Sequence, residues 1–167
     1  MDLLDRALQL TDFSPLGRRD CGSLCRKRCC QGGPEEGIFL LPGEERYYQK
    51  ETWATLRRLP DPLTGLTSTL LVCFGKCRRE LRPLACRTFP LVPVLAAGGR
   101  LELRLDGRGI LICPLVQTGD LQVLHPAFLR RVKRAWRLLL RDPAVFTLVE
   151  RASCRREMTE PWEKLLR

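Results

Sequence analysis

The chain has nine cysteines, and eight of them fall between residues 21 and 113. Four thiols share the ten-residue stretch from Cys21 to Cys30, and a second set begins at Cys73-Phe-Gly-Lys-Cys77 and continues to Cys86. Thiolate is a preferred ligand of zinc and of iron–sulfur clusters. Thiols that are close in the sequence also close a site at low cost in loop entropy. The spacing therefore predicts metal ligation.

The redox compartment decides between metal ligation and disulfides. Residues 1–10 are acidic where a secretory signal needs positive charge, and they lack a long apolar segment. We therefore expect a cytoplasmic protein, in which an odd number of bunched thiols favours metal over disulfides or unligated thiols. The sequence has no apolar run of about 18 residues, so we predict no membrane span.

Seven thiols are predicted metal ligands: Cys21, Cys25, Cys29, Cys30, Cys77, Cys86 and Cys113. Side chains of neighbouring residues generally point apart. We therefore expect Cys29 and Cys30 to serve different metals, or one to ligate while the other packs. Cys154, alone on a predicted helix, is predicted to be structural or free. Arg82 and Arg87 stand close to the cysteines in the sequence, and we predict that they donate to the cofactor and offset its negative charge.

Four sequence features occur here in a diagnostic order. A cysteine-rich start ending in Cys29-Cys30 is followed by Gly37-Ile-Phe-Leu-Leu-Pro-Gly-Glu44, then by Cys77 with Arg82-Pro-Leu-Ala-Cys86-Arg-Thr-Phe-Pro-Leu91, and then by Cys113-Pro114. Over about residues 20–116 this order resembles the YkgJ-type cysteine-cluster family of zinc- or iron-chelating domains. The opening departs from the usual C-x2-C-x2-C-C, so the choice among Cys21, Cys25 and Cys29 stays open.

The resemblance implies a metal-chelating domain similar to the cluster-binding part of flagellin lysine N-methylase. The implied cofactor is an iron–sulfur cluster, with [4Fe–4S] favoured, or zinc or iron ions. The resemblance does not extend to the basic C-terminal helices.

The elements that must position these thiols are short and of mixed type. Leucines at helical spacing predict a helix within residues 1–13 with Asp2 as its cap, and charge placement predicts another over Glu44–Leu59. Apolar or alternating runs predict five extended segments, the last two of them paired. They are Ile38–Leu41, Leu66–Phe74, Leu91–Leu95 and a hairpin of Leu101–Leu105 with Ile110–Cys113. The predicted fold is α+β: a small irregular metal-stapled domain with short strands or a hairpin and C-terminal helices.

The pattern becomes helical at Pro126. One face of the first helix is apolar, with Phe128, Val132, Ala135, Trp136 and Leu139, and the rest is basic. A second helix is predicted at about Pro143–Arg155, capped by Asp142. We therefore divide the chain into a metal-chelating domain, residues 1–125, and a basic helical extension packed on it, residues 126–167.

The charge balance bears on partners. The formal net charge is +10, and 24 of the 29 cations are arginine. Such a balance suits an anionic partner at the basic C-terminal helix, but an ordinary solvated face, with arginine used in place of lysine because of base composition, is the favoured explanation. Nucleic acid is one such partner, although not the favoured one.

Three functions compete at this point. The first is a metal-binding protein holding an iron–sulfur cluster, iron or zinc, with its biological role open. The second is a metalloenzyme related to flagellin lysine N-methylase that acts on protein side chains. The third is a zinc-stabilised nucleic-acid-binding module. The sequence has one histidine, His125, and no P-loop or G-x-G-x-x-G pattern, so no catalytic residue is predicted.

Overall fold

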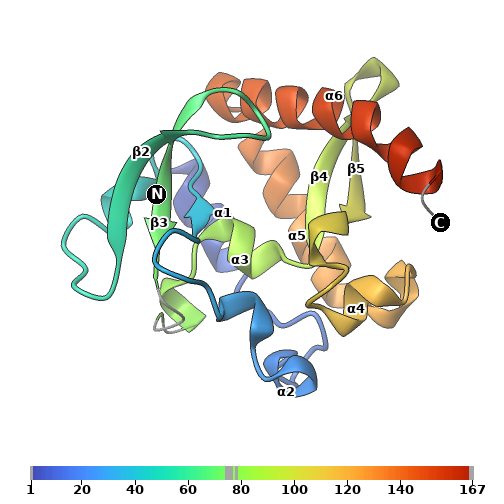
Figure 1. Cartoon of the computed structure of the whole chain (residues 1–167), viewed down its shortest axis with the longest axis horizontal. Coiled ribbons are helices and arrows are strands. Elements are labelled where there is room, and N and C mark those ends of the chain that lie inside the picture. Colours follow the sequence, from blue (N-terminus) through green and yellow to red (C-terminus); the bar gives the residue numbers. More distant parts are fainter. Residues whose placement is uncertain (1, 74–76, 78, 166–167) are drawn as a thin grey trace.

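Helix α5, Pro126–Leu139, lies at the centre of the molecule (Figure 1). The computed structural model describes residues 2–73, 77 and 79–165. The predicted apolar face of α5 is confirmed, because Phe128, Val132 and Ala135 are fully buried and Trp136 and Leu139 nearly so. Pro126 occupies the first turn, where its missing N–H costs nothing, and His125 accepts the Ala127 N–H at the cap.

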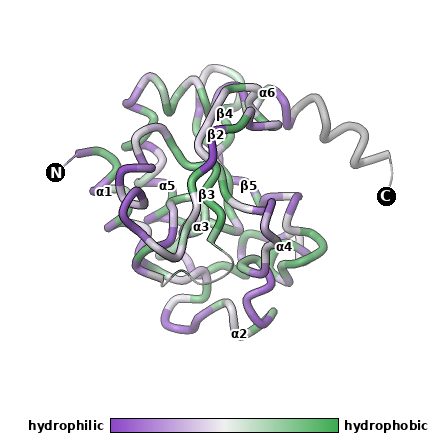
Figure 2. The backbone as a smooth tube through the Cα atoms, turned by 60° about the vertical axis from the view of Figure 1, so that its left-hand side comes forward, coloured by the Kyte–Doolittle hydropathy of each residue, from purple (hydrophilic) through white to green (hydrophobic). Residues whose placement is uncertain are grey.

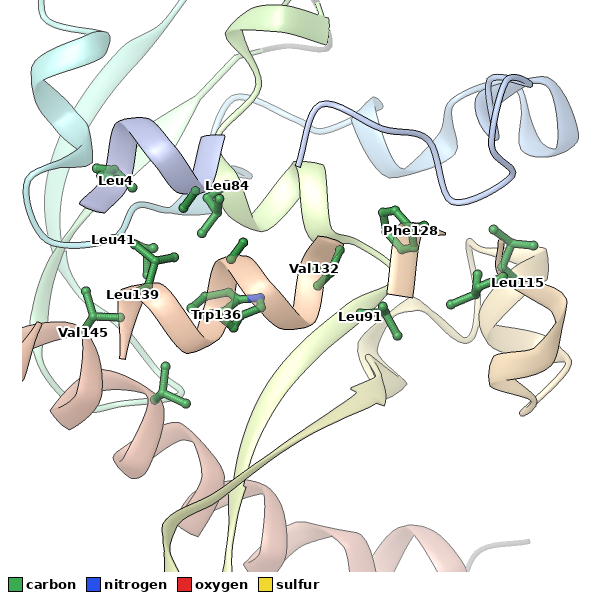
Figure 3. Packing of buried hydrophobic residues seen from close by; sticks show 14 of the residues in the cluster. Leu4, Leu41, Leu84, Leu91, Leu115, Phe128, Val132, Trp136, Leu139 and Val145 are labelled. Carbon is green, nitrogen blue, oxygen red and sulfur yellow. The ribbon is translucent and has the colours of Figure 1, made fainter. Parts of the chain in front are cut away.

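Side chains from distant parts of the chain pack on this face. Leu4 and Ala7 come from α1 (Leu3–Leu10), Leu84 comes from α3 (Leu84–Thr88), and Val145 comes from α6 (Pro143–Leu165) (Figure 3). The predicted N-terminal helix is therefore confirmed, as is its cap: Asp2 and Asp5 form a reciprocal capping box. The helix predicted to begin near Pro143 is also present, with Asp142 accepting the Ala144 N–H, and it continues to Leu165.

Two small antiparallel sheets complete the α+β fold that the sequence predicts. The first has the order β1 (Ile38–Phe39), β3 (Thr67–Val72), β2 (Thr55–Pro60). The second pairs β4 (Leu91–Ala96) with β5 (Arg100–Leu105). β4 contains Pro93, which a two-stranded sheet tolerates because each strand is an edge. Phe74, at the end of the predicted Leu66–Phe74 strand, lies outside the described residues.

The helix predicted over Glu44–Leu59 is wrong. The chain makes only a 3-10 turn at Glu44–Tyr47 and then runs as β2, antiparallel to β3 with Leu56 opposite Leu71. The reason is the turn that follows β2. Asp61 accepts hydrogen bonds from the Leu63 N–H and the Thr64 hydroxyl, and Gly65 adopts a φ of 70°. What looked like a helix stop is therefore the turn of a β-hairpin.

The predicted hairpin of Leu101–Leu105 with Ile110–Cys113 is also wrong in its second strand. β5 pairs with β4 through the turn at Gly98 and Gly99, which both have positive φ. After β5 the Asp106 side chain accepts the Arg108 N–H and starts a 3-10 turn at Gly107–Gly109. The chain then passes through further turns to α4 (Pro114–Gln117), with Cys113 at its cap position. Cys113 is therefore placed by a helix start and not by a strand end.

The cysteine-rich segment lies at the far end of the molecule from α6. Its one-turn helix α2, Gly22–Cys25, is at the opposite pole in both views (Figures 1 and 2). Within the part of the chain that the structure describes, no helix has both the length and the apolar character needed to cross a bilayer.

Candidate metal centre

The first cysteine cluster is folded as two tight turns. α2 carries Cys25, and a 3-10 turn at Arg28–Cys30 follows it. Between them Arg26 and Lys27 have φ values of 52° and 58°, which is unusual for residues that carry a Cβ. The Gln31 side-chain amide donates to the Arg26 carbonyl at 2.8 Å and fixes this reversal. The reversal brings Cys29 back beside Cys25.

The thiols of Cys29 and Cys30 face each other. Their Sγ atoms lie 3.9 Å apart, so the expectation that these neighbours point apart is wrong. The alternation of side chains applies to extended strands, and these two residues lie in a 3-10 turn. One thiol donates to the other, which lowers the pKa of Cys30 to about 6 and raises that of Cys29.

A first thiol set gathers at α2 and the α4 cap. Four thiols line one small hollow of about 20 Å³, closed on its other sides by apolar residues such as Phe89 and Leu115. Consistent with this proximity, negative charge on Cys25 and Cys21 adds to the rise in the pKa of Cys29. Cys113 is buried, and the other members are partly or fully exposed. The first thiol set is Cys21, Cys25, Cys29 and Cys113.

A second thiol set gathers where β3 ends and α3 begins. Cys77 has a raised pKa because its thiol hydrogen-bonds to Cys73, because it is partly buried, and because the charges of Cys73, Cys86 and Cys30 lie close to it. Burial, followed by the charges of Cys30 and Cys73, raises the pKa of Cys86 to about 12. Each of these thiols therefore lies within the electrostatic reach of the others. The second thiol set is Cys30, Cys73, Cys77 and Cys86.

Cys73 was not among the predicted ligands. It stands directly after the last residue of β3, Val72, and β3 was predicted from the sequence. The signal that could have found Cys73 was this position: a strand end that delivers a thiol to the same place as Cys77.

Arg82 lies beside the second thiol set. Its partial burial works against the charged form, yet the charges of Cys30, Cys77, Asp20 and Cys29 outweigh this and raise the pKa of the guanidinium. Its Nε is buried and has no hydrogen-bond partner among the described residues. A buried donor without a partner is costly, and the thiols of Cys30 and Cys77 are the groups whose charges act most strongly on this guanidinium.

Arg87 is placed differently from Arg82. Its guanidinium donates to three backbone carbonyls, those of Arg82 at 2.7 Å, Leu8 at 3.1 Å and Glu80 at 2.5 Å. These bonds tie α1 and the segment before α3 to α3 itself. The predicted contact of Arg87 with a cofactor stays a prediction.

Glu44 positions α3 and therefore Cys86. Its side chain is fully buried, and its two carboxylate oxygens accept the Leu84 N–H at 2.6 Å and the Leu41 N–H at 3.0 Å. Burial raises the pKa of this carboxyl against the effect of the two hydrogen bonds. The sequence predicted only a helix start at Glu44 and gave no sign of this role.

His125 and Cys154 lie apart from both thiol sets. The His125 ring caps α5 and packs edge-on against Phe13 at a centroid distance of 5.4 Å. Cys154 is exposed on α6. Among residues 2–73, 77 and 79–165, no three Cys, His, Asp or Glu side chains are already arranged as ligands of one ion. The thiols are gathered but not drawn into coordination geometry.

No protein-family model, curated protein or solved structure matches this chain. The resemblance to the YkgJ-type family therefore stays a prediction.

Proposed function

We propose that this protein binds metal through clustered cysteine thiolates, in two four-thiolate sites that meet at Cys29 and Cys30. The single observation that carries the proposal is the contact between these two thiols, 3.9 Å apart, at the junction of the two thiol sets. Eight of the nine cysteines then have a role, and the ninth, Cys154, lies exposed on another element.

The chemistry of the donor set supports the proposal. Four thiolates satisfy Zn²⁺ in a tetrahedral site and equally satisfy a [4Fe–4S] cluster. Thiolates without a metal repel one another, and this repulsion adds to the Cys73 hydrogen bond and the burial that raise the pKa of Cys77, and to the burial that raises the pKa of Cys86. A cation at the centre of each set removes this repulsion, and Arg82 would offset the remaining negative charge.

Binding draws the ligands inward. Because the thiols are gathered but not in coordination geometry, part of the metal-binding free energy orders the segments that carry them. The two left-handed residues, Arg26 and Lys27, lie in one of these segments, and a bound metal stabilises the strained turn they form. The metal would therefore stabilise the cysteine-rich end of the molecule. An iron–sulfur cluster is the favoured occupant and zinc or iron ions are the alternative.

Metal analysis of anaerobically purified protein tests the proposal. The expected result is zinc or iron bound at a fixed stoichiometry, with brown colour and acid-labile sulfide if the occupant is an iron–sulfur cluster. A colourless protein with stoichiometric zinc retains the proposal and removes the cluster. The matched control is Cys154→Ser, which should bind the same amount of metal as the wild type. Metal content no higher in the wild type than in a Cys29→Ser/Cys30→Ser variant would overturn the proposal.

A further inference from the structure

A groove rich in arginine runs between α1 and α5, away from both thiol sets. Its volume is about 870 Å³. The apolar face of α5 is turned into the core, so the charged residues of the same helix are left on the outside. Six of the side chains that line the groove are arginines: Arg6, Arg130, Arg131, Arg134, Arg137 and Arg141.

These six arginines have no acidic counterparts within the described part of the chain. None of them takes part in an ion pair there, although all six are exposed. The acidic residues nearest in the sequence to Arg6 are Asp2 and Asp5, and Arg46 pairs with both of them. Among the described residues, no carboxylate therefore forms an ion pair that would neutralise the positive charge of the groove.

Most of these arginines also follow one another at a regular spacing in the sequence. Arg130, Arg134 and Arg137 follow one another at four- and three-residue steps, which places them in a row about 10 Å long along α5 at 1.5 Å per residue, and Arg141 lies just beyond the end of that helix. Arg131 is held by stacking, with its guanidinium carbon 4.8 Å from the centre of the Phe13 ring. A row of cations along a groove matches a linear polyanion.

We propose that this arginine groove binds the phosphate backbone of nucleic acid without reading its sequence. The guanidinium group presents a planar fork of donors that matches two oxygens of one phosphate, and each contact releases condensed counterions. Arginine supplies every cation at the groove. The apolar lining is limited to Leu10 and Leu138, which leaves no aromatic platform on which bases could stack. Recognition is therefore through the backbone.

An anionic membrane fits this surface less well. A helix that binds at a membrane surface inserts an apolar face beside its cations, whereas the apolar face of α5 is buried in the core. The surface is also a groove, and a bilayer cannot enter a groove. An acidic protein would need apolar anchors at the centre of its interface, and the groove offers only two leucines.

Salt-dependent binding of a short random-sequence DNA duplex and of its single strand tests the proposal. If all six arginines contact phosphates, the logarithm of the association constant should fall with the logarithm of salt concentration at a slope of up to about −5. In the double variant Arg134→Gln/Arg137→Gln the slope should become shallower by about 2. The matched control is Arg58→Gln/Arg151→Gln, which removes the same charge from exposed positions outside the groove and should keep the wild-type slope.

Three results would overturn the proposal. The first is no binding to either probe at about 50 mM salt, where phosphate-driven association is strong. The second is an equal change of slope in the two double variants, which would assign the effect to net charge. The third is binding to phosphatidylserine vesicles together with no binding to nucleic acid. Circular dichroism and metal content of both double variants should equal those of the wild type, so that failure of this proposal is distinct from failure of metal binding.

Discussion

The Sγ atoms of Cys29 and Cys30 lie 3.9 Å apart although each thiol belongs to a different set. On the Cys29 side the nearby charges are those of Cys25 and Cys21, and on the Cys30 side they include that of Cys73. The dipeptide therefore links α2 and the α4 cap on one side to the end of β3 and α3 on the other. Two metals bound there would lie on either side of the Cys29-Cys30 dipeptide, so the binding of one would influence the affinity for the other.

Loss of a thiol from the second set should remove metal from that set alone. Changing Cys86 to Ser should remove the metal of one of the two sites, so that the metal bound per protein falls by about half. It should also reduce the free energy of unfolding, because metal binding contributes to folding. Cys77→Ser should behave in the same way. Metal content by elemental analysis and unfolding in denaturant measure the two effects. Cys154→Ser is the control, and unchanged metal in both Cys77→Ser and Cys86→Ser would remove these residues from the site.

The division into two sets makes a prediction about pairs of variants. Cys25→Ser and Cys113→Ser should each cost the metal of the first set, so combining them should cost no more than either alone. Cys25→Ser combined with Cys73→Ser should cost both metals, because the two residues belong to different sets. Such non-additivity is the signature of residues that act as a unit. Equal losses in the two double variants would show that the eight thiols form a single site.

The sequence predicted best where the pattern is local. The buried face of α5 and the capping of α1 follow from residues within a few positions of each other, and both are present in the structure. The segment 44–59 was predicted wrongly because its charges suit a helix. Its structure is determined instead by the pairing of β2 with β3 across the turn at Asp61. Such pairing joins residues that are too far apart in the sequence for a local pattern to indicate it.

The grouping of the thiols likewise has a local part, which the sequence indicates, and a tertiary part, which it does not. Spacing indicated which cysteines lie close in the sequence, and Cys21, Cys25 and Cys29 do lie together around one hollow. Spacing could not indicate that Cys113 joins them, because the α4 cap reaches that hollow only through tertiary packing. Likewise the predicted strand end marks Cys73 itself, but the sequence does not indicate that Cys73 lies near Cys30 and Cys86, because that proximity depends on tertiary packing.

The buried carboxylate of Glu44 should matter more than an ordinary surface charge. In Glu44→Gln one oxygen still accepts, but the amide N–H₂ meets the second backbone N–H. The Leu84 or Leu41 N–H is then left without an acceptor in a buried place, which should cost about 1–3 kcal/mol of the free energy of unfolding. Denaturant unfolding measures the cost. The control is Glu45→Gln at a partly exposed neighbour, and equal stability of the two variants would contradict the role of Glu44 in holding α3.

Asp106 should give part of the molecule's resistance to acid. Its carboxylate is buried and accepts from the Arg108 Nε at 2.9 Å and Nη2 at 2.7 Å, and the Arg156 guanidinium lies at 3.5 Å. Burial works to raise the pKa of Asp106, but these arginines outweigh it, so the pKa lies below its ordinary value of 3.8. The stabilisation is therefore fully present above pH 3.8 and lost as the pH falls through the lower, folded-state pKa.

The pH profile of Asp106→Asn distinguishes this ion pairing from packing. Near neutral pH the variant should be less stable by about 1–3 kcal/mol, since Arg108 and Arg156 lose a charged acceptor. Below the ordinary pKa of Asp106 the wild-type and variant curves should converge, because protonation removes from the wild type what the substitution removed from the variant. Unfolding free energies measured from neutral to acid pH provide both curves. Asp12→Asn at an exposed position is the control and should follow the wild type throughout, whereas a constant gap between wild type and Asp106→Asn would mean that Asp106 acts through shape and not through charge.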